Sequence, residues 1–362
     1  MDHLRRIRAL RKQMQLLKNE AMLVTNLPDV RYLCGFTGSN AALAITLNRA
    51  SLFTDGRYTA QAKEETKGAR VVIAEKSALR DACSWLEDSG AAHAQFDPEQ
   101  TTVAALDLMR EGLSKAKRRS FFQPLEKALV SLLRQVKDAD ELLLMENAAL
   151  LGCNLFTAVL PHIQSGIAET EIAADLEFFA RSLGAEGMSF DTIVASGKRS
   201  ALPHGRATET KLPRNGFVTL DFGVILKGYC SDMTRTVYVG KPGKQELFAY
   251  DAVLEAQEAA VAAVRPGATC GEVDNAARSV LLKAGLAKYF THSTGHGVGL
   301  EIHEQPRVAA KQDSVLEPGM VITIEPGIYM EGKFGIRIED MVAVTESGGK
   351  ILTPAPKAMI QL

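Results

Sequence analysis

The feature that most restricts the fold is an internal repeat in the second half of the chain. Residues 166–184 (GIAETEIAADLEFFARSLG) and 267–285 (GATCGEVDNAARSVLLKAG) have equal length, and each ends in a glycine that can cap a helix. A histidine, a strand with an embedded acid and a second such strand follow each predicted helix. The residues that recur in this order are His204, Asp221 and Asp232, then His303, Glu325 and Glu339. This order predicts two similar halves around a pseudo-two-fold axis, with their acids meeting at the centre.

The acids of the repeat lie in sequence that otherwise predicts buried strands. They occur in the segments VTLDFG, CSDMTRT, VITIEPG and IRIEDMVAV. Burial of an ionised carboxylate is costly unless a positive charge compensates it. His296, flanked by glycines in TGHGVG, adds an imidazole with close backbone access. We therefore predict a metal centre whose ligands are Asp221, Asp232, His296, Glu325 and Glu339.

Strand alternation separates the ligands from their neighbours. In GIRIEDMVAV, Arg337 and Glu339 fall on one face of the predicted strand, and Asp340 falls on the other. Ligating carboxylates are themselves hydrogen-bonded. The pattern therefore favours Glu339 over Asp340 as a ligand. It also predicts that Arg337 and Thr234 form hydrogen bonds to the ligands.

The composition of this ligand set indicates the kind of metal. Carboxylates and imidazole without thiolates suit manganese or cobalt, with iron or zinc as alternatives. Four negative charges exceed what one divalent ion needs, so we expect two ions about 3.5–4 Å apart, bridged by carboxylates. Such a pair can hold a bridging hydroxide and polarise a carbonyl. His204 and His303 fit charge-stabilising or proton-transfer roles beside it, and His292 is a further candidate for the site.

The first third of the chain alternates strand and helix patterns, which predicts a small α/β domain over residues 1–127. Within it, NLPDVRYLCGFTGSN (residues 26–40) is expected to be rich in turns. Pro124 and mixed charges mark the connection, and residues 128–362 form the second, α+β domain. Two domains also agree with the length, because single cores stop growing near ~250–300 residues.

Several classes of protein are disfavoured by composition. The net charge of −1 gives no indication of nucleic acid or anionic membrane as a partner. No segment approaches ~20 apolar residues, and the basic opening predicts an amphipathic helix, with mitochondrial targeting as the alternative. Five scattered cysteines without a CxxC pair predict a reducing compartment, and so the cytoplasm.

The motifs also resemble a known family. Asp221 and Asp232 stand eleven residues apart, and His296 and His303 seven apart. Together with LDFG, SDMTRT, THSTGHGVGLEIHE, EPGIY and GIRIED, this spacing is similar to that of the pita-bread metallopeptidases: methionine aminopeptidase, aminopeptidase P and prolidase. The segments NLPDVRYLCGFTGSN and LFTDGRYTAQAKEE resemble the creatinase/prolidase-type N-terminal domain. That domain favours the proline-directed branch, and the resemblance implies a curved antiparallel sheet in the catalytic domain.

The resemblance implies a role for each residue. By it, Asp221 and Glu339 bridge two metal ions, Asp232 completes the shell of one ion, and His296 and Glu325 complete that of the other. His204 and His303 match substrate-contacting, proton-shuttling histidines. All five ligand positions are intact, which argues against the metal-free creatinase branch and against a non-catalytic binding protein. Family members usually form dimers in which the N-terminal domain of one subunit shapes the site of its neighbour.

The reaction implied is hydrolysis of the Xaa-Pro peptide bond in dipeptides or short peptides by water that dimanganese or dicobalt activates. An Xaa-Pro dipeptidase must neutralise a free carboxylate just past the scissile bond. Arg307 in HEQPRV stands at a prolidase-like spacing and can bind a carboxylate through two hydrogen bonds, the alternative being a surface loop arginine. We expect His292 and Arg307 to bind substrate. The dipeptidase is favoured, and aminopeptidase P, which acts on longer peptides, remains the alternative.

Overall fold

The computed structural model describes residues 1–362 and divides into two compact units, residues 1–134 and 135–362. The boundary expected after residue 127 falls instead after residue 134. The reason is helix α6 (Leu129–Gln135), in which Leu129, Val130 and Arg134 are buried. Arg134 Nη1 also contacts Asp29 Oδ1 at 2.7 Å within that unit.

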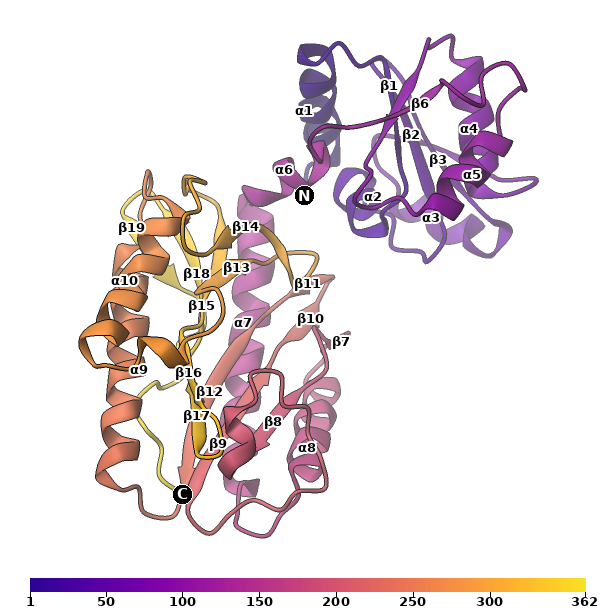
Figure 1. The fold of residues 1–362 in the computed structure, drawn as a ribbon. Helices are drawn as coiled ribbons and strands as arrows, with labels where there is room; N and C mark the ends of the chain where they lie inside the picture. Colours follow the sequence, from indigo (N-terminus) through magenta and orange to yellow (C-terminus); the bar gives the residue numbers. More distant parts are fainter. The chain divides into compact units, whose positions relative to one another are not determined.

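The first unit is built on one six-stranded mixed sheet in the order β4-β3-β2-β1-β5-β6. Strands β1, β2 and β3 pair antiparallel, while β3–β4, β1–β5 and β5–β6 pair in parallel. Helices α4 and α5 pack on this sheet around a common core (Figure 1). The strands are β1 (Ala21–Val24), β2 (Ala42–Thr46), β3 (Ala50–Thr54), β4 (Arg70–Ile73), β5 (Ala94–Phe96) and β6 (Phe122–Pro124). The remaining helices are α1 (His3–Leu16), α2 (Leu27–Cys34), α3 (Thr59–Glu65), α4 (Ala78–Asp88) and α5 (Val103–Glu111).

Helix α2 corrects one expectation, because it lies in the segment that was expected to consist of turns. The Asn26 side chain accepts a hydrogen bond from Asp29 N at 3.0 Å and so caps the helix. Pro28 is compatible with the first turn, where its missing N–H costs nothing. Gly35 ends the helix with φ +84°. The same residues that favour turns here mark both ends of a short helix.

The second unit contains only antiparallel strand pairs. Its first half forms the sheets β12-β9-β8 and β11-β10-β7, and its second half forms β14-β13-β15-β18-β19 and the hairpin β16-β17. The strands of the first half are β7 (Gly187–Met188), β8 (Ile193–Ser196), β9 (Gly216–Phe222), β10 (Val224–Leu226), β11 (Tyr229–Cys230) and β12 (Met233–Val239). Those of the second half are β13 (Gly295–Gly297), β14 (Glu304–Val308), β15 (Val321–Ile324), β16 (Gly327–Met330), β17 (Phe334–Arg337), β18 (Asp340–Thr345) and β19 (Gly348–Ile351).

Each half carries its own pair of helices. Helices α7 (Ala139–Val159) and α8 (Glu169–Ser182) pack with β8, β9 and β12 in one core, and α9 (Lys244–Ala263) and α10 (Cys270–Lys283) pack with the later strands in another. The strands lie between the two helix pairs (Figure 1). This is the two-half, pita-bread arrangement that the repeat and the resemblance predict.

Local details of the repeat agree between the halves. Gly184 follows α8 with φ +95°, and Gly285 follows α10 with φ +71°. The residues before the two helices, Ala168 and Thr269, each form an isolated antiparallel bridge to a later segment. Thr269 also forms a capping box with Glu272 at the start of α10. The two sequence segments of equal length therefore fold in the same way.

Helix α7 is long and apolar enough to cross a membrane by length and composition. Nine of its 21 residues are buried within the second unit, among them Met145, Leu155 and Phe156. The helix begins at a capping box formed by Asp138 and Glu141. Packing against the first-half strands accounts for its apolar composition.

Candidate metal centre

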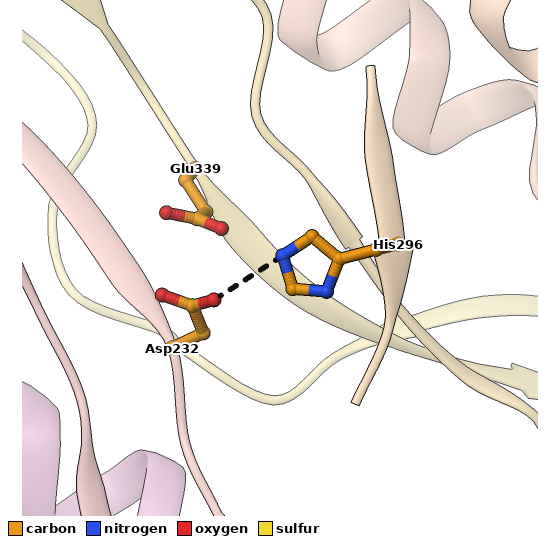
Figure 2. A group of neighbouring side chains, drawn as sticks. All are labelled: Asp232, His296 and Glu339. Carbon is orange, nitrogen blue, oxygen red and sulfur yellow. Dashed lines mark ion pairs between the residues drawn. The ribbon is translucent and has the colours of Figure 1, made fainter. Parts of the chain in front are cut away.

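Three of the predicted ligands converge between the two halves of the second unit. Ligand atoms of Asp232, His296 and Glu339 all lie within 4.8 Å of one another, and Figure 2 shows their side chains turned toward a common centre. His296 Nε2 stands 3.6 Å from Asp232 Oδ2 and 3.5 Å from Glu325 Oε1. The structure thus brings one acid of the first half against two acids and a histidine of the second.

The backbone around the ligands differs from the expected strands. Asp221 lies inside β9 and His296 inside β13, but Asp232 precedes β12, Glu325 follows β15, and Glu339 falls between β17 and β18. Backbone hydrogen bonds hold these positions, from Glu339 N to Thr234 O at 3.1 Å and from Glu325 N to Thr294 O at 2.7 Å. Strand ends free a side chain from the strict alternation of a strand, which lets ligands from separate sheets point at one place.

The glycines beside His296 are needed for close approach of neighbouring backbone. A Cβ at Gly295 would lie 1.9 Å from Thr323 O, and one at Gly297 would lie 2.2 Å from Gln305 O. The register of β13 against β14 also shifts between His296 and Gly297. Such a bulge re-aims a side chain relative to a regular strand. Gly295 and Gly297 therefore allow the close backbone packing that directs the His296 imidazole toward the acids.

Asp221 supplies a direct test of whether the residues fit a metal. Its Oδ2 accepts a hydrogen bond from Arg337 Nη2 at 2.5 Å, while its Oδ1 is buried without any hydrogen-bond partner. A buried carboxylate oxygen without a partner is costly. A cation at this position would satisfy it, so the donor set fits a metal.

The pKa values of the ligand carboxylates also indicate a metal site. Burial, followed by repulsion from neighbouring acids, holds the pKa values of Asp232 and Glu339 well above their ordinary ranges. Burial likewise raises the pKa of Glu325 to about 8, and the charge of Asp221 adds to the effect. The four carboxylates are opposed by one guanidinium, that of Arg337. Without further positive charge the site has to retain protons, and divalent ions would remove that need.

His296 is arranged as a neutral ligand. Its Nδ1 stands 2.9 Å from Gly297 O, which can only accept, so Nδ1 carries the proton and Nε2 presents its lone pair to the acids. Burial lowers the pKa of His296 to about 4. A neutral imidazole with one nitrogen tied to a carbonyl is the form in which histidine binds metals.

Arg337 and Thr234 form hydrogen bonds to the ligands. Thr234 Oγ1 donates to Glu339 Oε2 at 2.6 Å and accepts from Arg337 Nε at 3.0 Å. Arg337 also donates from Nη1 to the hydroxyl of Tyr329 at 2.7 Å. Sequence reasoning missed Tyr329, although it lies in the EPGIY motif four residues after Glu325. This network fixes two carboxylates through one arginine.

His292 lies at the end of this network. Its Nδ1 stands 2.7 Å from Ser293 O and its Nε2 2.9 Å from the Tyr329 hydroxyl, so both ring nitrogens are engaged within the protein. Burial lowers the pKa of His292 to about 4, so the ring is neutral and Nε2 accepts from the tyrosine. This arrangement favours orientation of Tyr329 over direct contact with a substrate.

The remaining candidates lie on the accessible side of the centre. The rings of His303 and His296 are 4.5 Å apart, and burial, then the charge of His204, lowers the pKa of His303. Neighbouring groups remove water from only part of the His303 imidazole, because the His303 side chain as a whole is exposed, as is that of His204. Arg307 lies opposite His296 in the β13–β14 pair, and its side chain is also exposed. These three residues are therefore open to an incoming ligand.

Asp340 points away from the centre. It contacts Arg235 Nη2 at 2.8 Å and accepts a hydrogen bond from Gln257 at 2.9 Å, and all three residues are buried. Arg235 also donates to the carbonyls of Glu339 and Ala355. Sequence reasoning missed Arg235, whose partners are about a hundred residues distant in the chain. The pair ties the final segment of the chain to the strand that follows Glu339.

Family models and known protein structures were compared with the chain. Residues 144–346 match the model of metallopeptidase family M24, and residues 6–136 match the creatinase/prolidase N-terminal domain. An Xaa-Pro dipeptidase of Pyrococcus furiosus is 45% identical over 228 residues, 63% of this chain and 66% of that protein. The solved structure of an Xaa-Pro dipeptidase from Bacillus anthracis has a TM-score of 0.95 and 39% identity, with both chains fully covered. An X-Pro aminopeptidase from Thermotoga maritima has a TM-score of 0.88 and 36% identity, covering 97% of this chain and all of that one.

Proposed function

Since the chain belongs to metallopeptidase family M24, we propose that it is an Xaa-Pro dipeptidase that hydrolyses the peptide bond before proline. The observation that carries the proposal is the convergence of Asp232, His296 and Glu339 from both halves, beside the unpartnered Oδ1 of Asp221. The names of the similar dipeptidases from Pyrococcus furiosus and Bacillus anthracis support the substrate class.

Asp221, Asp232, His296, Glu325 and Glu339 would hold two divalent ions. When bound, the ions supply an acidified water for attack and an electrophile that polarises the peptide carbonyl. The chain itself keeps the ligands in place. Thr234 orients Glu339, and Arg337 orients Asp221 and balances part of the negative charge.

His204 and His303, the two exposed histidines of the site, are the candidates for proton transfer. Cleavage of an Xaa-Pro bond leaves a secondary amine, which must gain a proton as the C–N bond breaks. His303 is neutral near pH 7 because of its lowered pKa, and it lies against His296. A neutral imidazole at His303 or His204 can take the proton that the attacking water releases and pass it to the proline nitrogen, which is general acid–base catalysis.

Arg307 is the candidate for recognising substrate length. In a dipeptide the proline carries a free carboxylate, and a guanidinium can bind it through two hydrogen bonds. Arg307 lies opposite His296 on the neighbouring strand and projects from the surface. Aminopeptidase P activity is the second candidate, because the Thermotoga maritima X-Pro aminopeptidase has almost the same fold.

The proposal extends to the metal and the setting. The oxygen-rich ligand set supports manganese or cobalt. The five cysteines are all free and buried, which supports a reducing compartment such as the cytoplasm. A homodimer is part of the proposal by resemblance to proline-directed relatives.

The test uses purified protein, stripped with chelator and reloaded with Mn²⁺. We expect hydrolysis of Xaa-Pro dipeptides, slower hydrolysis of matched Xaa-Pro-Yaa tripeptides, and little cleavage of Xaa-Ala controls. Faster turnover of the tripeptides would favour the aminopeptidase. No cleavage of any of these peptides by a fully loaded protein would refute the proposal.

A further inference from the structure

A buried carboxylate outside the metal centre holds the segment that carries His204. Glu169 is the first residue of α8, and its side chain is completely buried. Its Oε1 accepts hydrogen bonds from Ser196 N at 2.8 Å and Ser196 Oγ at 2.9 Å. Its Oε2 accepts from Thr208 N at 3.1 Å and Thr208 Oγ1 at 2.9 Å. Arg199 Nε adds a charged contact at 3.0 Å.

These partners lie at the two ends of one loop. Ser196 is the last residue of β8, and Thr208 closes the segment 197–207, which has His204 near its middle. A single carboxylate therefore joins both ends of the loop. Arg199, held by Glu169, braces the loop further by donating from Nη2 to Arg206 O at 2.6 Å.

The loop also contacts the network around the metal ligands. Arg337 Nη1, whose guanidinium binds Asp221, donates to Pro203 O at 3.0 Å. The backbone next to His204 is thereby tied to the metal centre, while the His204 ring makes no hydrogen bond of its own in the structure. Its position depends on the loop backbone, and the loop backbone depends on Glu169.

The second half of the unit contains a parallel arrangement. On α10, buried Asp274 binds Arg278 at 2.7 Å and accepts from Thr294 Oγ1 at 2.8 Å. Arg278 Nη2 in turn donates to His292 O at 2.6 Å. In both halves, then, a buried acid on the second helix holds an arginine that braces a histidine-bearing loop.

We propose that Glu169 is a positioning residue that keeps His204 at its place relative to the metal centre during Xaa-Pro hydrolysis. The proposal rests on the proposed function. Glu169 contacts none of the predicted metal ligands, so its effect on catalysis passes through His204 and leaves the metal affinity unchanged.

The experiment is a double-mutant cycle with metal-loaded protein. Glu169→Gln keeps the shape but turns an amide N–H₂ toward groups that are themselves donors. We expect kcat for an Xaa-Pro dipeptide to fall about 10- to 100-fold, as for a catalytic group displaced by about 1 Å. In a His204→Ala background the same change should have almost no further effect, because coupled residues are not additive. Metal content should stay at the wild-type value in all four proteins.

The matched control is Glu171→Gln. Glu171 lies two residues along the same helix, and its side chain is 56% exposed, with Lys211 at 3.1 Å. We expect its kcat to equal that of the wild type. Trypsin adds a structural readout, because Glu169→Gln should speed cleavage after Arg206, whose side chain is 78% exposed, and Glu171→Gln should not.

Three results would overturn the proposal: an unchanged kcat in Glu169→Gln, an equal loss with and without His204, or a loss that follows reduced metal content. If Glu169→Gln does not fold, Ser196→Ala decides, since the Ser196 hydroxyl bonds only to Glu169, at 2.9 Å. It should lower kcat in the presence of His204 and not in its absence. A wild-type protein that cleaves no Xaa-Pro peptide would refute the proposed function, a result distinct from any of these.

Discussion

The carboxylate cluster should make the metal-free protein less stable than a variant that lacks one of its ligands. We predict that Glu325→Gln raises the free energy of unfolding of the chelated protein at pH 8. Glu325 has its pKa raised from an ordinary 4.5 to about 8, mainly by burial. This corresponds to at most about 5 kcal/mol of unfavourable interaction with the ionised form. Solvent reaches 18% of the side chain and a neighbouring acid can take up the proton instead, so we expect about 2–4 kcal/mol.

The sign of the effect follows from linkage. Because the pKa is higher in the folded than in the unfolded protein, the contribution of Glu325 to stability is complete below about pH 4.5. It is lost as the pH rises through about 8. The advantage of the glutamine should therefore be absent near pH 4.5 and grow with pH. With Mn²⁺ present the order should reverse, because the variant lacks a ligand and gains less from metal binding.

The assay is urea unfolding of the wild type and the variant at pH 5 and pH 8, each with chelator and with Mn²⁺. Glu331→Gln, in the exposed turn between β16 and β17, is the matched control and should leave all four values unchanged. A chelated variant that is equal to or less stable than the wild type at pH 8 would refute the argument. In that case burial would not disfavour the ionised form of Glu325 in the metal-free site.

Other predictions follow from single contacts. Glu339→Ala should abolish dipeptide hydrolysis and lower the bound metal, and substantial turnover after reloading would contradict its role as a metal ligand. Arg307→Ala should raise KM for Xaa-Pro about 10-fold or more, with little change for Xaa-Pro amides, because only the free acid offers a carboxylate; equal changes would exclude the carboxylate contact. Tyr329→Phe removes an acceptor of Arg337 and should lower kcat with little change in metal content. An unchanged kcat would show that Arg337 needs no support from Tyr329. Chelation should lower Tm more at pH 8 than at pH 5, because protons replace metal in the acid cluster at the lower pH.

The ligands of the metal centre could be predicted from the sequence because carboxylates are unusual in apolar, strand-like segments. Asp221 and Glu325 interrupt apolar runs where a carboxylate is costly, and the repeat gives them matching places in two halves. Strand alternation favours Glu339 over Asp340 as a ligand. In the structure Glu339 lies between two strands, and Asp340 faces the opposite way, toward Arg235.

The partners of these residues could not be found in the same way. Tyr329, Arg235 and Glu169 interact with residues that are mostly remote in sequence, as in the 105-residue separation of Arg235 and Asp340. No local pattern shows that an ordinary strand arginine or helix glutamate is buried and paired. Helix α2 was missed for a different reason, since Pro28 and Asp29 favour a turn and the first turn of a helix equally.

The central claim, that both halves supply ligands to one two-metal site, is tested most directly by metal stoichiometry. Chelated protein is titrated with Mn²⁺ by calorimetry, and the bound metal is measured after dialysis. We predict two ions per chain, falling in both Asp232→Asn from the first half and His296→Ala from the second, with dipeptide hydrolysis lost in parallel. Fewer than one ion per chain in the wild type, or full occupancy in either variant, would contradict the claim.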